Sequence, residues 1–165
     1  MDDQPASSEM SFIAEVSSLE RLALFAMEWV APELIERAPK LIFLRGAMGS
    51  GKTSFVSKVA AVLGAADAAS PSFALHSRYT GPRGTIDHFD LDRLQSMDDL
   101  ESIGFWDLIE EARAEPRRFV MIEWVGRLDE FGAGSEQATW THGFRTWTFS
   151  FEGPPHWRVI RRRLA

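Results

Sequence analysis

Short apolar runs alternate with amphipathic stretches along the chain, and their order predicts strands separated by helices. The run Lys40–Arg45 is almost continuously apolar, as expected of a strand buried on both faces. Lys52–Leu63 repeats apolar residues at helical spacing and ends at Gly64, a residue type that commonly caps helices. Phe119–Glu123 is a second short apolar run, which predicts another buried strand.

The segment before the first buried run predicts an extended piece and a helix. The extended piece lies around Met10–Val16, and Leu19–Val30 has amphipathic spacing. Ser17 and Glu20 have the spacing of a capping box, so the helix is expected to begin there. Residues 1–9 are expected to form a flexible N-terminus.

The middle of the chain predicts a hairpin followed by a broken helix. Strands are expected at Phe73–Tyr79 and Thr85–Asp90, because turn-forming residues 80–84 separate them. Asp98–Ala114 reads as a helix interrupted near Gly104.

The last forty residues predict a loop and a second hairpin. Residues 126–144 are polar and glycine-bearing without clear periodicity, and are expected to form a mobile loop. Thr146–Phe151 and Trp157–Arg161 alternate like two late strands. Residues 1–165 are therefore predicted to form a single α/β domain with a mixed, largely parallel central sheet flanked by helices.

Composition narrows the classes of protein to which the chain can belong. The 165 residues are 45% hydrophobic, which is enough for a buried core, and none is cysteine, which excludes disulfide scaffolds and thiolate sites. No apolar run is long enough to span a bilayer and the opening residues are acidic and polar, so we expect a cytoplasmic protein without membrane contact. The net charge of −6 argues against a protein that binds nucleic acid alone.

An eight-residue glycine loop follows the first buried run. The octad Gly46-Ala47-Met48-Gly49-Ser50-Gly51-Lys52-Thr53 fits the pattern G-x-x-x-x-G-K-[ST], and Ser54 continues it into the predicted helix. The glycines allow backbone N–H groups to turn toward phosphate oxygens, and the helix points the positive end of its dipole at the same charge. This segment predicts a P-loop NTPase.

Two side chains of the loop have more specific tasks. Lys52 is expected to reach the β- and γ-phosphates, and the Thr53 hydroxyl is expected to coordinate Mg²⁺. The predicted cofactors are ATP and Mg²⁺. ATP is preferred to GTP because the guanine-specificity pattern Asn-Lys-x-Asp does not occur in the sequence.

A P-loop also needs a carboxylate beside the metal and a group that orients the attacking water. Asp90 and Glu123 each close a predicted strand, so both can project above the phosphate edge of the sheet. Taken alone, each is as easily a solvated carboxylate. His88 and Trp124 are ambiguous, because residues of these types next to strands are usually structural.

Together these segments resemble one family, the TsaE-type (YjeE) ATPases of bacterial tRNA threonylcarbamoyladenosine biosynthesis. The resemblance lies in the glycine loop after a strand and a helix, Ser70-Pro-Ser-Phe73, His88-Phe-Asp-Leu-Asp-Arg93 with Leu94, and Ile122-Glu-Trp124. It implies that Asp90 and Glu123 surround Mg²⁺ and the attacking water. It also implies that Ser72 is a switch-like hydroxyl near the γ-phosphate and that Trp124 is catalytically required alongside Lys52.

The same resemblance implies partners. A Mg-dependent ATPase of low activity would be stimulated by a TsaD-type threonylcarbamoyl transferase and its TsaB-type paralogue, which modify the adenosine beside the anticodon of tRNA. The tRNA would be contacted indirectly through that complex, which suits the acidic charge of the chain.

Departures from the family pattern keep two other functions open. The family usually has an acidic residue at Ala47, threonine at Ser72, tyrosine at Asp92 and proline at Val125. A nucleotide-gated binding module without turnover is one alternative. The other is a small-molecule kinase of the shikimate kinase type, which has a similar loop but begins almost at it and carries an arginine-flanked glycine triplet that this chain lacks.

Overall fold

Seven strands form one mixed sheet in the computed structural model, which describes residues 12–65, 74–133, 139–152 and 158–164. The strands lie in the order β1-β7-β6-β2-β5-β4-β3. Their bounds are β1 Phe12–Val16, β2 Lys40–Arg45, β3 His76–Gly81, β4 Gly84–Asp90, β5 Arg118–Glu123, β6 Arg145–Glu152 and β7 Arg158–Leu164. Strands β6, β2, β5 and β4 run parallel at the centre, and antiparallel pairs close both edges. The predicted α/β class and both predicted hairpin pairings are confirmed.

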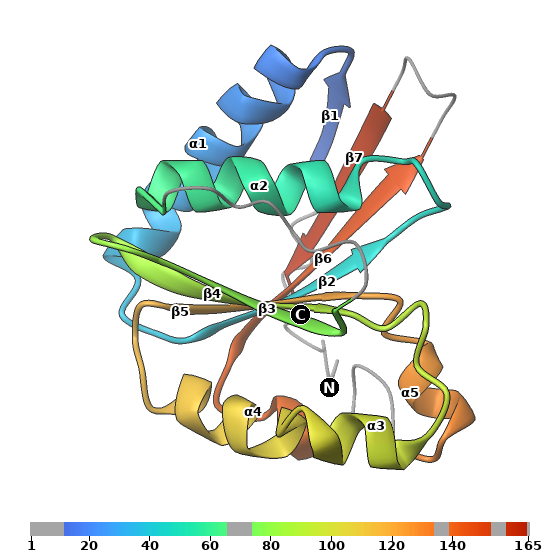
Figure 1. The fold of residues 1–165 in the computed structure, drawn as a ribbon. Helices are drawn as coiled ribbons and strands as arrows, with labels where there is room; N and C mark the ends of the chain where they lie inside the picture. Colours follow the sequence, from blue (N-terminus) through green and yellow to red (C-terminus); the bar gives the residue numbers. More distant parts are fainter. Residues whose placement is uncertain (1–11, 66–73, 134–138, 153–157, 165) are drawn as a thin grey trace, which may run out of the picture.

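Helices cover both faces of this sheet. Figure 1 shows α1 and α2 above the sheet and α3, α4 and α5 below it. The helices are α1 Leu19–Ile35, α2 Lys52–Leu63, α3 Met97–Ser102, α4 Phe105–Arg113, α5 Arg127–Glu130 and the 3₁₀ turn η1 Thr139–Thr141. As the sequence predicted, the break between α3 and α4 falls near Gly104. The backbone of Gly104 is left-handed.

Each face of the sheet has its own hydrophobic core. Between the sheet and α1 and α2, the rings of Trp29, Phe55 and Phe149 meet with centroids 5.0 to 5.8 Å apart. On the other face, Phe89 meets Phe105 of α4 at 4.9 Å. Strand β2, which leads into the glycine loop, contributes to both cores and is therefore held from two sides.

Helix α1 begins at Leu19 as predicted but differs from the prediction in its cap and at its C-terminal end. Its N-cap is Ser18 rather than Ser17, and the Ser18 hydroxyl accepts a hydrogen bond from the Arg21 N–H at 3.2 Å. The helix also continues past Pro32 to Ile35. Glu33 is buried in this last turn and pairs with Arg145 of β6 at 3.0 Å. This tertiary contact stabilises the helical conformation after Pro32, which local helix propensity does not favour.

The segment 126–144 contains more structure than the expected mobile loop. Its described part includes α5 and η1, and Leu128 and Thr141 are buried. Trp140 packs against Phe43 and Phe105 of the lower core, with ring centroids 6.2 and 6.0 Å away. Residues 134–138 lie outside the described part of the chain, as do the predicted flexible residues 1–9.

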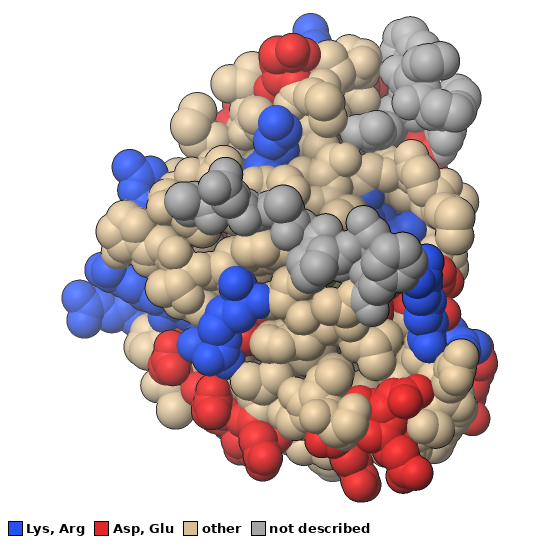
Figure 2. Space-filling view, viewed as in Figure 1, with Lys and Arg blue, Asp and Glu red and all other residues tan. Residues whose placement is uncertain are grey.

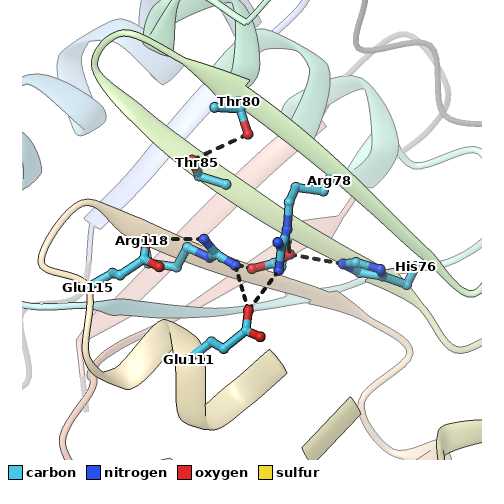
Figure 3. Close-up of polar contacts among 8 residues, drawn as sticks. His76, Arg78, Thr80, Thr85, Glu111, Glu115 and Arg118 are labelled. Carbon is cyan, nitrogen blue, oxygen red and sulfur yellow. Dashed lines mark hydrogen bonds and ion pairs between the residues drawn. The ribbon is translucent and has the colours of Figure 1, made fainter. Parts of the chain in front are cut away.

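A charged network centred on the buried Asp87 lies between the middle of β4 and helix α4. Asp87 is fully buried, and its carboxylate accepts hydrogen bonds from His76 at 2.9 Å, from Arg78 at 2.8 Å and from Arg118. Figure 3 shows Arg78 and Arg118 also converging on Glu111 of α4, at 3.3 and 3.6 Å. The network joins β3, β4, β5 and α4.

Acidic side chains dominate one border of the molecule. In Figure 2 they gather along the lower edge, where α3 and α4 lie. These helices carry Asp98, Glu101 and Glu110 among others. Within the described residues, no helix has the length and apolar character needed to cross a membrane.

Candidate functional site

Parallel register brings the carboxyl ends of three central strands to one edge of the sheet. Leu44 of β2 lies opposite Glu123 of β5, and Glu123 lies opposite Asp90 of β4. The glycine loop begins directly after β2, so both predicted carboxylates stand beside it. In doubly wound sheets, ligands bind at this edge.

The glycine loop has the backbone of a phosphate cradle. Gly46, Gly49 and Gly51 have φ angles of 142°, 76° and 107°, which side chains rarely allow. A Cβ at Gly46 would also lie 2.7 Å from the carbonyl oxygen of Phe151. Helix α2 begins at Lys52, so the positive end of its dipole faces the loop.

Lys52 is buried inside this loop. Its Nζ donates to the carbonyl oxygens of Gly46 at 2.6 Å and Ala47 at 2.9 Å, and lies 4.5 Å from the centre of the Trp124 ring. Burial lowers the pKa of Lys52, against the opposing charges of Glu123 and other nearby carboxylates. The ammonium is thus placed where phosphate oxygens would meet it.

Glu123 connects the loop to the neighbouring strands. The Thr53 hydroxyl donates to Glu123 Oε1 at 2.8 Å, and His88 Nε2 lies 2.9 Å from the same oxygen. Asp90 accepts a hydrogen bond from the Asp92 N–H at 3.2 Å. Burial raises the pKa of Asp90, and the charge of Glu123 adds to this effect.

These side chains line a pocket of about 210 Å³. Its walls are Met48, Gly49, Gly51, Lys52, Thr53, Ser54, Asp90, Asp92, Glu123 and Trp124. A second pocket of about 460 Å³ lies beside it, lined by residues 44–47, 124–127 and 130. Trp124 lines both pockets, and it is the one non-glycine of the described residues with a positive φ, 59°. A backbone held in this region costs about 1–2 kcal/mol.

The phosphate pocket suits a hard divalent cation. Its candidate ligands are the Thr53 hydroxyl and the carboxylates of Glu123 and Asp90, all oxygen donors of the kind that Mg²⁺ prefers. Among the described residues, no group of three or more His, Cys, Asp or Glu side chains could hold a metal by itself. An ion here would therefore take its remaining ligands from water and nucleotide phosphates, as Mg²⁺ commonly does.

Most of the predicted site residues come together, with four exceptions. Gly46 and Ala47 line the second pocket rather than the first, and Ser50 lines neither of the two. Ser72 lies outside the described residues. The sequence left His88 ambiguous, and its contact with Glu123 becomes apparent only when β4 and β5 are paired.

A family model and two relatives of known name agree on one family. The model of the family described as "Threonylcarbamoyl adenosine biosynthesis protein TsaE" matches residues 17–146. The tRNA threonylcarbamoyladenosine biosynthesis protein TsaE of Borreliella burgdorferi is 30% identical over 112 residues, covering 68% of this chain and 77% of that protein. The protein of the same name from Aquifex aeolicus is 37% identical over 97 residues, covering 57% and 73%. A crystal structure of Bacillus subtilis YdiB has the same fold, with a TM-score of 0.61, 16% identity and coverage of 97% and 90%.

Proposed function

The chain belongs to the TsaE family and so has a role in tRNA threonylcarbamoyladenosine biosynthesis; we propose that it fulfils this role by binding ATP with Mg²⁺ and hydrolysing it. The observation that carries the proposal is the 2.8 Å hydrogen bond between Thr53 and Glu123. It joins the metal-binding position of the glycine loop to the carboxylate at the end of the neighbouring parallel strand.

The residues of the loop bind and orient the triphosphate. Backbone N–H groups between Gly46 and Thr53 surround the phosphates, and the Lys52 ammonium neutralises charge on the β- and γ-phosphates. Thr53 and Glu123 would hold Mg²⁺ on one side of the pocket. When bound, this ion would supply positive charge that stabilises the negative charge developing on the phosphates.

Asp90 is the candidate that orients the attacking water. Its carboxylate lies one strand away from Glu123 at the same level of the sheet, and its raised pKa makes it a better proton acceptor than an ordinary aspartate. Water would attack the γ-phosphorus, the bond to the bridging oxygen would break, and ADP and phosphate would leave. Ser72 and Trp124 are proposed to act near the γ-phosphate, on the basis of the family resemblance.

Partner proteins are the proposed targets of this hydrolysis. An acidic chain is poorly suited to hold tRNA alone, so we assign tRNA binding to a TsaD-type transferase and its TsaB-type paralogue. Hydrolysis would then reset the assembly, and turnover would be slow without the partners. A cytoplasmic location stays a prediction.

The test is ATP hydrolysis by wild type and Glu123→Ala, each alone and with the transferase pair, after nucleotide binding has been confirmed. Glu101→Ala is a matched control, because this carboxylate is exposed on α3, away from the pocket. We expect the pair to stimulate the wild type and the control, and Glu123→Ala to lose at least about a hundredfold in rate.

The other outcomes identify the alternatives. Tight nucleotide binding without turnover, even with the pair present, would favour the nucleotide-gated module. Hydrolysis that is indifferent to the pair would favour the small-molecule kinase. In either case the proposed coupling to partners would be wrong.

A further inference from the structure

His88 occupies a buried position directly behind the carboxylate end of the site. It lies on β4 two residues before Asp90, so its side chain and that of Asp90 leave the same face of the sheet. Its register partner on β5 is Met121, and Glu123 comes two residues later on that strand. The imidazole therefore reaches forward along the sheet to the next carboxylate on the same face. His88 and Glu123 are only 2% and 3% exposed.

The imidazole and the Thr53 hydroxyl meet the same oxygen. His88 Nε2 lies 2.9 Å from Glu123 Oε1, and Thr53 Oγ1 lies 2.8 Å from it. Because an ionised carboxylate only accepts hydrogen bonds, the imidazole N–H must donate. Two donors, one from β4 and one from α2, thus fix the rotation of the Glu123 carboxylate. Neither bond uses Oε2.

We propose that His88 is a positioning residue that holds Glu123 against the Thr53 hydroxyl and so preorganises the metal side of the pocket. The inference rests on the proposed function of the site as a Mg-ATP site. His88 touches neither phosphate nor metal in this scheme and acts through Glu123 alone. Hydrogen-bond donors that orient a metal ligand in this way typically contribute tenfold or more to metal affinity or activity.

The buried carboxylate next to His88 on β4, that of Asp87, shows why a histidine suits this position. Asp87 is bound by two guanidinium groups and an imidazole, so its charge is compensated within the protein. Glu123, by contrast, has no Lys or Arg ion-pair partner among the described residues, and its side-chain hydrogen bonds come from one imidazole and one hydroxyl. These two donors orient the carboxylate without a guanidinium beside it.

The packing around His88 allows its shape and its hydrogen bond to be separated experimentally. The ring stacks on Tyr79 of β3, with centroids 6.4 Å apart and planes 29° apart. His88→Phe keeps an aromatic ring there and removes the donor. His88→Gln places an amide N–H near the position of Nε2. His88→Asn is polar but too short to reach Glu123, and serves as a second donor-free variant if the phenylalanine variant does not fold.

The measurement is binding of N-methylanthraniloyl-ATP to the whole chain, first in EDTA and then across a Mg²⁺ titration, with thermal unfolding of every variant. We expect His88→Phe and His88→Asn to bind the probe in EDTA within about twofold of wild type, but to need roughly tenfold more Mg²⁺ for half of the metal-dependent gain, equivalent to about 1.4 kcal/mol. His88→Gln should need no more than about threefold more Mg²⁺ than wild type.

Three results would overturn the inference. One is an unchanged Mg²⁺ requirement in a folded, donor-free variant. Another is an equal loss of probe binding with and without Mg²⁺, which would indicate a packing role. The third is a folded glutamine variant that behaves like the phenylalanine variant. Failure of the proposed function is distinguishable, because wild type itself would then show no Mg²⁺-dependent binding of the probe.

Discussion

Replacing Asp87 with asparagine should destabilise the fold more than any change at the surface of the same network. The carboxylate is fully buried and accepts hydrogen bonds from His76, Arg78 and Arg118. An amide of nearly the same shape keeps one acceptor oxygen but turns an N–H₂ group toward a donor. It also removes the charge that compensates Arg118, which is only 5% exposed.

The size of the effect follows from what remains around Arg118. Breaking a buried ion pair by removing one partner costs about 3–5 kcal/mol, since the other charge stays buried without compensation. Glu115 at 3.1 Å and Glu111 at 3.6 Å still contact Arg118, although both are more than half exposed. We therefore expect the lower end, about 3 kcal/mol. For a domain of this size this corresponds to a drop of about 6–12 °C in melting temperature.

Urea denaturation and thermal unfolding of purified protein would measure this loss. Glu111→Gln is the matched control, because it removes a charge from the same network at a side chain that is 55% exposed. Its effect should stay within about 0.5 kcal/mol. The double variant Asp87→Asn/Arg118→Met removes the uncompensated charge and should be more stable than Asp87→Asn alone.

The reasoning would be refuted by a loss below about 1 kcal/mol in Asp87→Asn, or by an equal loss in Glu111→Gln. A double variant less stable than the single one would also refute it. That result would mean that the packing of Arg118, rather than its charge, dominates.

The carboxylate of Asp87 should also make the stability of the fold depend on pH. Burial opposes the ionisation of Asp87, but the hydrogen bonds from His76 and Arg78 and the charge of Arg118 outweigh it and lower its pKa. A lowered folded-state pKa stabilises the fold fully above the unfolded pKa of about 3.9, and this stabilisation is lost as pH falls through the folded pKa. The difference in unfolding free energy between wild type and Asp87→Asn should be constant from pH 7 to about pH 5 and should shrink below about pH 4. A difference that shrinks already near neutral pH would contradict this assignment.

The remaining predictions concern the phosphate pocket. Burial and the charge of Glu123 raise the pKa of Asp90, so the ionised Asp90 side chain destabilises the fold at neutral pH. Asp90→Asn should therefore keep or raise the melting temperature, while the rate of ATP hydrolysis falls at least about a hundredfold. A clear drop in the melting temperature of Asp90→Asn would contradict the claim that ionised Asp90 destabilises the fold. Gly46→Ala places a Cβ 2.7 Å from the Phe151 carbonyl oxygen, whereas a Cβ at Gly49 meets nothing within 4 Å. Urea denaturation should therefore show a loss of about 1–2 kcal/mol for Gly49→Ala and a larger one for Gly46→Ala, which should also lose nucleotide binding; equal losses would argue against the close contact.

The sequence predicted best those parts of the fold that local pattern controls. The buried run Lys40–Arg45, the glycine loop and the helix Lys52–Leu63 are continuous along the chain, and each has the predicted bounds. Local pattern was weaker at α1, where a neighbouring serine caps the helix and the buried Glu33–Arg145 pair extends it beyond Pro32. That pair joins residues more than a hundred positions apart, so no local signal could reveal it.

Contacts between residues distant in the sequence also limited what could be predicted of the site. Thr53 and Glu123 were both singled out from the sequence, but their contact joins residues 70 positions apart and depends on β5 lying beside β2. Strand order is set by the pairing of whole strands, which hydrophobic pattern alone does not specify. The role proposed for His88 depends on the register of β4 against β5. Asp92 was noted only as a departure from the family, yet it lines the pocket and its N–H binds Asp90.

The two carbonyl bonds of Lys52 have a consequence for the affinity of the pocket for anions. The carbonyl oxygens of Gly46 and Ala47 accept hydrogen bonds from the ammonium at 2.6 and 2.9 Å, so they compete with any incoming anion for it. A ligand that binds the ammonium must replace both bonds, and its apparent affinity is its intrinsic affinity multiplied by the fraction of molecules in which the lysine is released. This factor is the same for inorganic phosphate and for a triphosphate. It lowers the affinity of both, so only an anion that makes enough other contacts with the loop would bind at low concentration.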